Sequence, residues 1–136
     1  MKILFDANIL IAALISHGAC KDLFDHCLGE HEIFTSQLIL QEVRQHLINK
    51  FGFTEKETRQ AINFLKINAA IIPHSPLPSS VCRDPDDDNI LAAAGAGDVD
   101  CLITGDKDLL VLKNFQKIPI LKPAAFWKFE KETPQA

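Results

Sequence analysis

Four acidic residues stand where apolar segments of this chain begin or end: Asp6, Glu42, Asp88 and Asp106. Asp6 directly follows the apolar residues 3–5, and Asp106 follows the mostly apolar residues 101–105. Carboxylates are rarely buried unless they are paired or bind a metal ion. If the fold brings the four together, they form a strong cation site, which points to a metal-dependent enzyme.

Helical spacing predicts which way two of these acids face. Glu42 lies four residues after Leu38 and next to Val43, on the shoulder of an apolar helix face. Asp88 precedes Leu91 and Ala92 by three and four residues, so it is expected to face inward in the same manner. Both carboxylates are therefore predicted to lean toward a sheet.

Gathering several carboxylates in one place raises at least one pKa unless a counter-ion is present. The hard cations Mg²⁺ and Mn²⁺ prefer oxygen ligands, and they can activate water and orient a phosphodiester. The chain has no evident zinc-binding set, since its histidines do not pair at helical ligand spacing and are expected at the surface.

Each acid also has an ordinary structural explanation. Asp86 and Asp87 suit the N-terminus of a helix, and Asp108 suits a turn or a cap. Asp6 could cap a helix, and Glu42 could be a solvated helix residue. The conjunction of four such acids favours the site, with Asn8 and Thr104 as hydrogen-bonding residues that orient it.

Composition and charge restrict the class of protein. The 136 residues are 47% hydrophobic and 24% charged with a net charge of −4, which fits one globular domain over residues 1–131 and a disordered tail over residues 132–136. An acidic chain needs metal ions and a local basic patch to attract a nucleic acid. The four cysteines form no CxxC pair and are expected to be reduced in a cytoplasmic protein, and no apolar stretch is long enough to span a membrane.

Short apolar segments alternate with helical patterns along the chain. Strands are predicted at residues 2–5, 32–35, 70–72, 101–104 and 118–121. Helices are predicted at residues 8–14, 20–28, 37–49, 55–68 with Ala61, Phe64 and Leu65 inward, from 86 or 87 to 95 or 97, 106–112 and 123–131. This alternation is typical of an α/β domain with a mostly parallel sheet, in which ligands bind beyond the carboxyl ends of the strands.

The ordered set of motifs resembles the PIN-domain family of metal-dependent ribonucleases. The matching segments are residues 4–10, 39–43, 83–91 and 102–110, within a resemblance that covers about residues 2–128. Within the family, the chain is most similar to the small single-domain proteins that act as toxins of toxin–antitoxin pairs.

The resemblance implies a three-layer α/β/α sandwich that cleaves single-stranded RNA with Mg²⁺ or Mn²⁺. Carried over by position, Asp6, Glu42, Asp88 and Asp106 are the metal ligands, with Asp108 as a further acid. Asp84, Asp86 and Asp87 leave the identity of the third ligand open, and Asp88 is chosen for its inward spacing. The expected partners are the RNA substrate, a cognate antitoxin protein and a second copy of the chain, with no membrane.

Contacts with nucleic acid are expected from four cations: Arg44, Lys50, Arg83 and Lys107. Two alternative functions remain open at this point. One is a PIN-like module that binds RNA or protein without cutting, and the other is a DNA or structure-specific nuclease that shares the metal chemistry.

Overall fold

A six-stranded sheet in the order β3-β2-β1-β4-β6-β5 forms the centre of the computed structural model, which describes residues 1–134. The strands are β1 (Lys2–Phe5), β2 (Glu32–Ser36), β3 (Ala70–Ile72), β4 (Cys101–Ile103), β5 (Asn114–Phe115) and β6 (Ile118–Leu121). All neighbours from β3 to β6 are parallel, and only β5 runs antiparallel, beside β6. The predicted α/β class with a mostly parallel sheet is confirmed.

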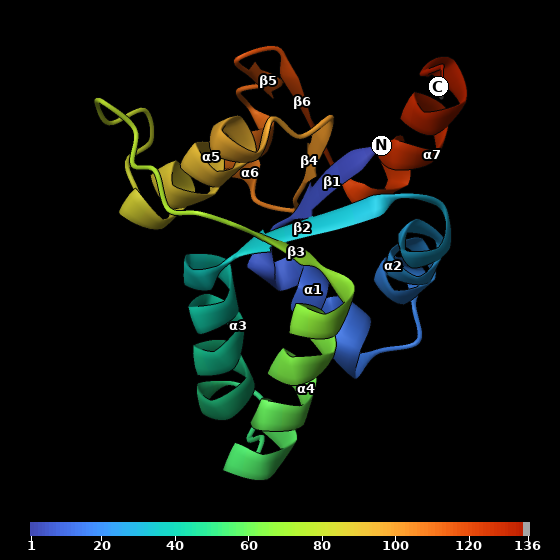
Figure 1. The fold of residues 1–136 in the computed structure, drawn as a ribbon, viewed down its shortest axis with the longest axis vertical. Coiled ribbons are helices and arrows are strands. Elements are labelled where there is room, and N and C mark those ends of the chain that lie inside the picture. Colours follow the sequence, from blue (N-terminus) through green and yellow to red (C-terminus); the bar gives the residue numbers. More distant parts are fainter. Residues whose placement is uncertain (135–136) are drawn as a thin grey trace.

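Helices cover both faces of this sheet. They are α1 (Ala7–Ile15), α2 (Ala19–Glu30), α3 (Gln37–Asn49), α4 (Glu55–Asn68), α5 (Pro85–Gly97), α6 (Lys107–Leu110) and α7 (Pro123–Glu132). In Figure 1, α1, α3 and α4 lie below the strands and α5 lies above them. The molecule is therefore the predicted sandwich of helices around a parallel sheet.

The two central strands explain why the sequence shows apolar runs rather than alternation. Ile3, Leu4 and Phe5 of β1 are completely buried, as are Leu102 and Ile103 of β4. A parallel strand with helices on both faces must present apolar side chains in both directions. Phe5 is paired with Ile103, so β1 and β4 end side by side at the same edge of the sheet.

Strand β5 was not predicted from the sequence. It forms a hairpin with β6 in which Phe115 pairs with Ile118 across the two residues Gln116 and Lys117. Both have positive φ, 49° and 67°, as a type I′ hairpin turn requires. Such turns usually carry Asn-Gly, and this one has neither residue, which removes the sequence signal.

Helix α4 begins with a capping box, because Thr54 accepts a hydrogen bond from the Glu57 amide and Glu57 accepts one from the Thr54 amide. Ile62 and Leu65 form its buried face, whereas Phe64 is 43% exposed. The prediction that Phe64 points inward was therefore wrong. Its ring lies at the surface, 6.2 Å from that of Phe24.

The C-terminal helix continues to Glu132, one residue beyond its predicted end. Glu132 is thus helical rather than part of a tail, and Thr133 donates a hydrogen bond to the Phe129 carbonyl at 2.7 Å. The predicted disorder of residues 135 and 136 lies outside the described residues. Among residues 1–134, no single helix has the length and apolar composition to cross a membrane. Helices α1 and α2 have that length and composition only when taken together, and the pair is bent by 101°.

Candidate active site

Asp6 lies at the carboxyl end of β1, where the chain turns into α1. One carboxylate oxygen accepts a hydrogen bond from the Ala7 amide at 2.7 Å, and the other accepts one from the Thr104 hydroxyl at 2.7 Å. Asp6 is only 8% exposed. Burial, the largest influence, raises the pKa of Asp6 even though both hydrogen bonds lower it.

Thr104 connects Asp6 to the next acidic segment. Its fully buried hydroxyl donates to Asp6 and accepts a hydrogen bond from the Asp106 amide at 3.0 Å. Asp106 then accepts a hydrogen bond from the Asp108 amide and caps α6. The ends of β1 and β4 are thereby tied together by one side chain.

The start of α5 supplies a further carboxylate to this edge. Asp84 caps the helix by accepting a hydrogen bond from the Asp86 amide at 2.9 Å, and Pro85 occupies the first turn. Asp87 is buried, with 8% of its surface exposed. Ligand oxygens of Asp87, Asp106 and Asp108 all lie within 4.8 Å of one another, close enough to hold one metal ion.

Asp88, the predicted third ligand, has a different environment. One of its oxygens accepts hydrogen bonds from the amides of Val81 and Cys82 at 3.1 and 2.8 Å, so it closes the loop before α5. The helix directs Asp87 rather than Asp88 toward Asp106. Helical spacing does not separate the two residues, because residues 90–94 are all buried and both acids therefore precede buried positions by three and four residues.

The carboxylates near this edge repel one another. Burial, a hydrogen bond shared with Asp106 and the charges of Asp106 and Asp84 raise the pKa of Asp87 to about 7. Burial and the charges of Asp6 and Asp86 raise the pKa of Glu42 to about 7. A cation bound among these groups would stabilise their charged forms, and oxygen donors suit a hard cation such as Mg²⁺ or Mn²⁺. The residues present therefore fit a divalent metal.

Glu42 lies on α3, facing a small cleft. The cleft has a volume of about 160 Å³, and its lining includes Gln41, Gln45, Asp86 and Asn89. The charge of Asp6 acts on Glu42, so the two belong to one electrostatic environment. Within the described chain, Glu42 is outside the group of Asp87, Asp106 and Asp108 that shares ligand distance.

His46, which was expected at the surface from the sequence, is a further polar residue of this region. It follows Glu42 by one helical turn, and its buried Nδ1 atom has no hydrogen-bond partner among residues 1–134. Burial and the charge of Lys50 lower the pKa of His46, while the charges of Asp86 and Asp6 raise it. The i, i+4 spacing to Glu42 was the signal that could have indicated it.

The four predicted cations are dispersed around the site and three are strongly exposed. Arg44 is ion-paired with Glu55 at 2.8 Å, and Arg83 contacts the Asp108 carboxylate at 3.2 Å. Lys50 ends α3 and Lys107 begins α6. The amide Asn8, predicted to orient the site, is exposed in the first turn of α1.

A parallel α/β sandwich with carboxylates gathered beyond the carboxyl ends of its central strands defines a class of proteins suited to metal-assisted hydrolysis. The model of the PIN domain matches residues 2–108, and the chain belongs to the PIN-domain family. It is accordingly a hydrolase of the nuclease class, and proteins of this family generally use divalent metals.

Uncharacterized protein MJ1680 of Methanocaldococcus jannaschii is 28% identical over 124 residues, which cover 86% of this chain and 78% of that protein. The crystal structure of VapBC2 from Rickettsia felis, bound to a DNA fragment from their promoter, matches with a TM-score of 0.63 and 16% identity, over 88% of this chain and 97% of that chain. The structure of FitAcB from Neisseria gonorrhoeae matches with a TM-score of 0.57 and 14% identity, over 90% and 98% of the two chains. At these identities the two structures support the fold.

Proposed function

We propose that this protein is a metal-dependent endoribonuclease that hydrolyses phosphodiester bonds of single-stranded RNA. The observation that carries the proposal is the group of Asp87, Asp106 and Asp108 beside the buried Asp6, with the pKa of Asp87 raised to about 7 by burial and by its acidic neighbours. Carboxylates that repel one another where strands end lower the stability of the fold, but the same oxygen atoms can bind a cation.

The metal ligands in this proposal are Asp6, Asp87 and Asp106, with Asp108 at the exposed side. Asp87 takes the role expected of Asp88, because Asp87 lies within ligand distance of Asp106 and Asp108, whereas one oxygen of Asp88 accepts hydrogen bonds from the amides of Val81 and Cys82. When bound there, Mg²⁺ or Mn²⁺ supplies charge neutralisation of the phosphate and lowers the pKa of a coordinated water.

The chain's own residues orient the reactants. Thr104 holds one oxygen of Asp6 and the amide of Asp106, which fixes the two carboxylates relative to each other. Glu42 faces the cleft with a pKa raised to about 7, which suits a group that accepts a proton from an attacking water near neutral pH. Lys50, at the end of α3, and Lys107, at the start of α6, are the cations proposed to contact the RNA backbone.

The cellular role that fits these features is that of the toxin in a toxin–antitoxin pair, acting in the cytoplasm. The sequence resemblance to toxins of the PIN family supports this role, as does the fold shared with one chain of the VapBC2 structure and one chain of the FitAcB structure over nearly the whole length of each. A cognate antitoxin is the expected protein partner, and a second copy of the chain is expected from the same resemblance.

The function is tested by incubating purified protein with end-labelled single-stranded RNA, single-stranded DNA and a flap duplex. Each substrate is incubated with Mg²⁺, with Mn²⁺ and with EDTA. Endonucleolytic fragments from RNA that require metal, and are absent with Asp6→Asn, are the expected result. Cleavage of DNA or the flap in preference to RNA would contradict the substrate class, and RNA binding in EDTA with no fragments under any condition would indicate a binding module.

A further inference from the structure

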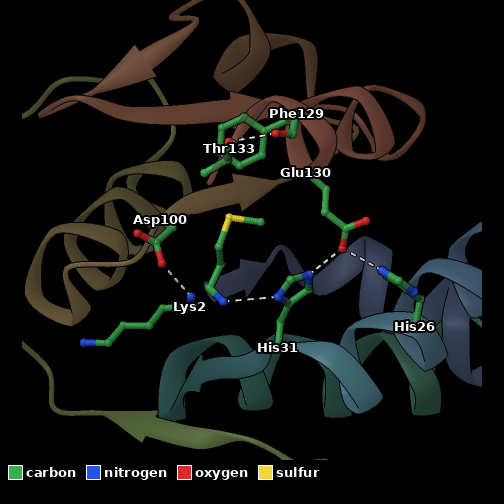
Figure 2. Close-up of polar contacts among 8 residues, drawn as sticks. Lys2, His26, His31, Asp100, Phe129, Glu130 and Thr133 are labelled. Carbon is green, nitrogen blue, oxygen red and sulfur yellow. Dashed lines mark hydrogen bonds and ion pairs between the residues drawn. The ribbon is translucent and has the colours of Figure 1, made fainter. Parts of the chain in front are cut away.

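A second group of side chains that could bind a metal lies at the amino end of β2. It is separate from the acidic site, which consists of Asp6, Asp87, Asp106 and Asp108 beyond the carboxyl ends of the strands. His26 belongs to α2, His31 is the residue that ends α2 before β2, and Glu130 belongs to α7. Figure 2 shows the two imidazole rings converging on the Glu130 carboxylate. The prediction that all histidines lie at the surface was therefore wrong for His31, whose side chain is only 3% exposed.

The geometry of this group is compact. The Nε2 atoms of His26 and His31 lie 2.6 and 2.5 Å from the same oxygen of Glu130, and one ligand atom from each residue fits within a span of 4.8 Å. A tetrahedral zinc ion with bonds of about 2.0–2.1 Å separates its ligand atoms by about 3.3 Å. Each Nε2 atom therefore needs to move away from the Glu130 oxygen by less than about 1 Å to reach this separation.

The surroundings resemble those of a built metal site. The Nδ1 atom of His31 lies 3.1 Å from the Met1 nitrogen, a contact that orients the ring with Nε2 toward Glu130. Aromatic rings enclose the histidines, with Trp127 4.8 Å from His26 and Phe126 5.8 Å from His31 between ring centroids. An apolar shell of this kind is common around metal-bound histidines.

We propose that His26, His31 and Glu130 form a binding site for a zinc-class dication, separate from the acidic site. Two imidazole nitrogens and one carboxylate are a ligand set that suits Zn²⁺, whereas the all-oxygen group of Asp87, Asp106 and Asp108 suits Mg²⁺ or Mn²⁺. With three protein ligands, the fourth position of a tetrahedral ion is left to water.

The proposed ion has a structural consequence, because its ligands come from different parts of the chain. His26 and His31 belong to the α2–β2 segment, and Glu130 is about 100 residues later, in the last two turns of α7. A bound ion would therefore fasten the C-terminal helix to α2 and to the start of β2. The ion would add to the connection that two hydrogen bonds to Glu130 and the packing of Phe126 and Trp127 on the histidine rings already make.

The test measures zinc bound after equilibrium dialysis, by elemental analysis, in protein that carries Asp106→Asn to weaken the acidic site. In that background, His26→Gln and Glu130→Gln are compared with the controls His74→Gln and Glu132→Gln, which alter an exposed histidine and an exposed carboxylate of α7. We expect one zinc per chain in the background protein and both controls, and an affinity lower by about tenfold or more in His26→Gln and Glu130→Gln.

Circular dichroism in EDTA tests whether every variant is folded. Replacing zinc with Co²⁺ gives an absorption spectrum that reports whether nitrogen and oxygen atoms bind the ion. Hydrogen exchange of residues 123–132 is expected to slow when zinc is added to the unmutated protein, and not in Glu130→Gln. Equal zinc binding by the site variants and their controls would overturn the proposal, as would the absence of zinc binding in the Asp106→Asn protein.

Discussion

At the scale of single residues, the hydroxyl of Thr104 connects the carboxyl ends of the two central strands, through hydrogen bonds to Asp6 and to the Asp106 amide. Thr104→Val removes the donor to Asp6 and the acceptor for the Asp106 amide while keeping the size of the side chain. Because one oxygen of the buried Asp6 carboxylate then lacks a partner, we expect a loss of about 1–3 kcal/mol in the free energy of unfolding. Cleavage of RNA is expected to fall by about tenfold or more, since the carboxylates are no longer held in position.

Urea unfolding and initial cleavage rates measure these two effects. Thr35→Val is the matched control, because Thr35 is equally buried and its hydroxyl has no hydrogen-bond partner within residues 1–134. That variant is expected to keep its stability, and Thr104→Ser is expected to keep most of its activity. If Thr104→Val behaves like Thr35→Val in both measurements, the hydroxyl does not position the site.

At this scale, the sequence predicted the positions of the acids better than their directions. Asp6 and Asp106 could be placed because each follows a short buried strand. The choice between Asp87 and Asp88 could not be made, because five consecutive residues after them are buried and helical spacing fits both. The loop amides that hold Asp88 come from a proline-containing segment whose path depends on tertiary contacts.

At the scale of elements, the first turn of α5 determines where Asp87 points. Asp84→Ala removes the cap of this helix and is expected to cost about 0.5–2 kcal/mol of stability. Because Asp87 lies in the same first turn, RNA cleavage should decrease as well. Thermal unfolding and cleavage assays at a temperature where both proteins are folded separate the two effects.

The control for this prediction is Thr54→Ala, which removes the cap of α4, a helix that contributes no proposed ligand. It should lose a similar amount of stability and keep its cleavage rate. A loss of activity in Thr54→Ala as large as that in Asp84→Ala would show that activity follows global stability rather than the geometry of α5.

Element prediction succeeded where local composition determines structure and failed where tertiary pairing does. The strands at residues 2–5 and 118–121 are continuous or nearly continuous apolar runs, and the capping box of α4 is a local signal. Strand β5 has two residues and depends on its partner β6, with a turn whose residues lack the usual preference for positive φ. The cluster of His26, His31 and Glu130 joins segments about 100 residues apart, so no local pattern indicates it.

At the scale of the whole molecule, the acidic edge makes stability depend on pH. The pKa values of Asp87 and Glu42 rise from ordinary values of 3.8 and 4.5 to about 7 in the folded protein. Between about pH 4 and pH 7 the native state therefore binds more protons than the unfolded state, and the free energy of unfolding contributed by these groups falls as pH rises.

This prediction is measured by urea unfolding in EDTA at a series of pH values. Glu42→Gln removes one of the two groups, so the fall in its stability between pH 4 and pH 7 should be smaller than in the unmutated protein. Added Mg²⁺ should reduce the fall in the unmutated protein, since a cation stabilises the charged carboxylates. The same pH dependence in both proteins would contradict the raised pKa of Glu42.

The fold places two chemically different groups at opposite ends of the parallel strands. The oxygen-rich group lies beyond the carboxyl ends of β1 and β4, and the histidine-containing group lies where β2 begins. Because the rigid central strands separate the two groups, substitutions in one should leave the other intact. This independence allows each proposal to be tested without disturbing the other.

The central claim, that Asp87 rather than Asp88 completes a metal-dependent nuclease site with Asp6 and Asp106, is tested most directly by comparing Asp87→Asn with Asp88→Asn. Both variants are assayed on labelled single-stranded RNA with Mn²⁺, beside the unmutated protein and after folding is confirmed by circular dichroism. We predict that Asp87→Asn loses cleavage by about a hundredfold or more, while Asp88→Asn stays within about tenfold of the unmutated rate. Loss of cleavage in Asp88→Asn with full activity in Asp87→Asn would contradict the site as the structure arranges it.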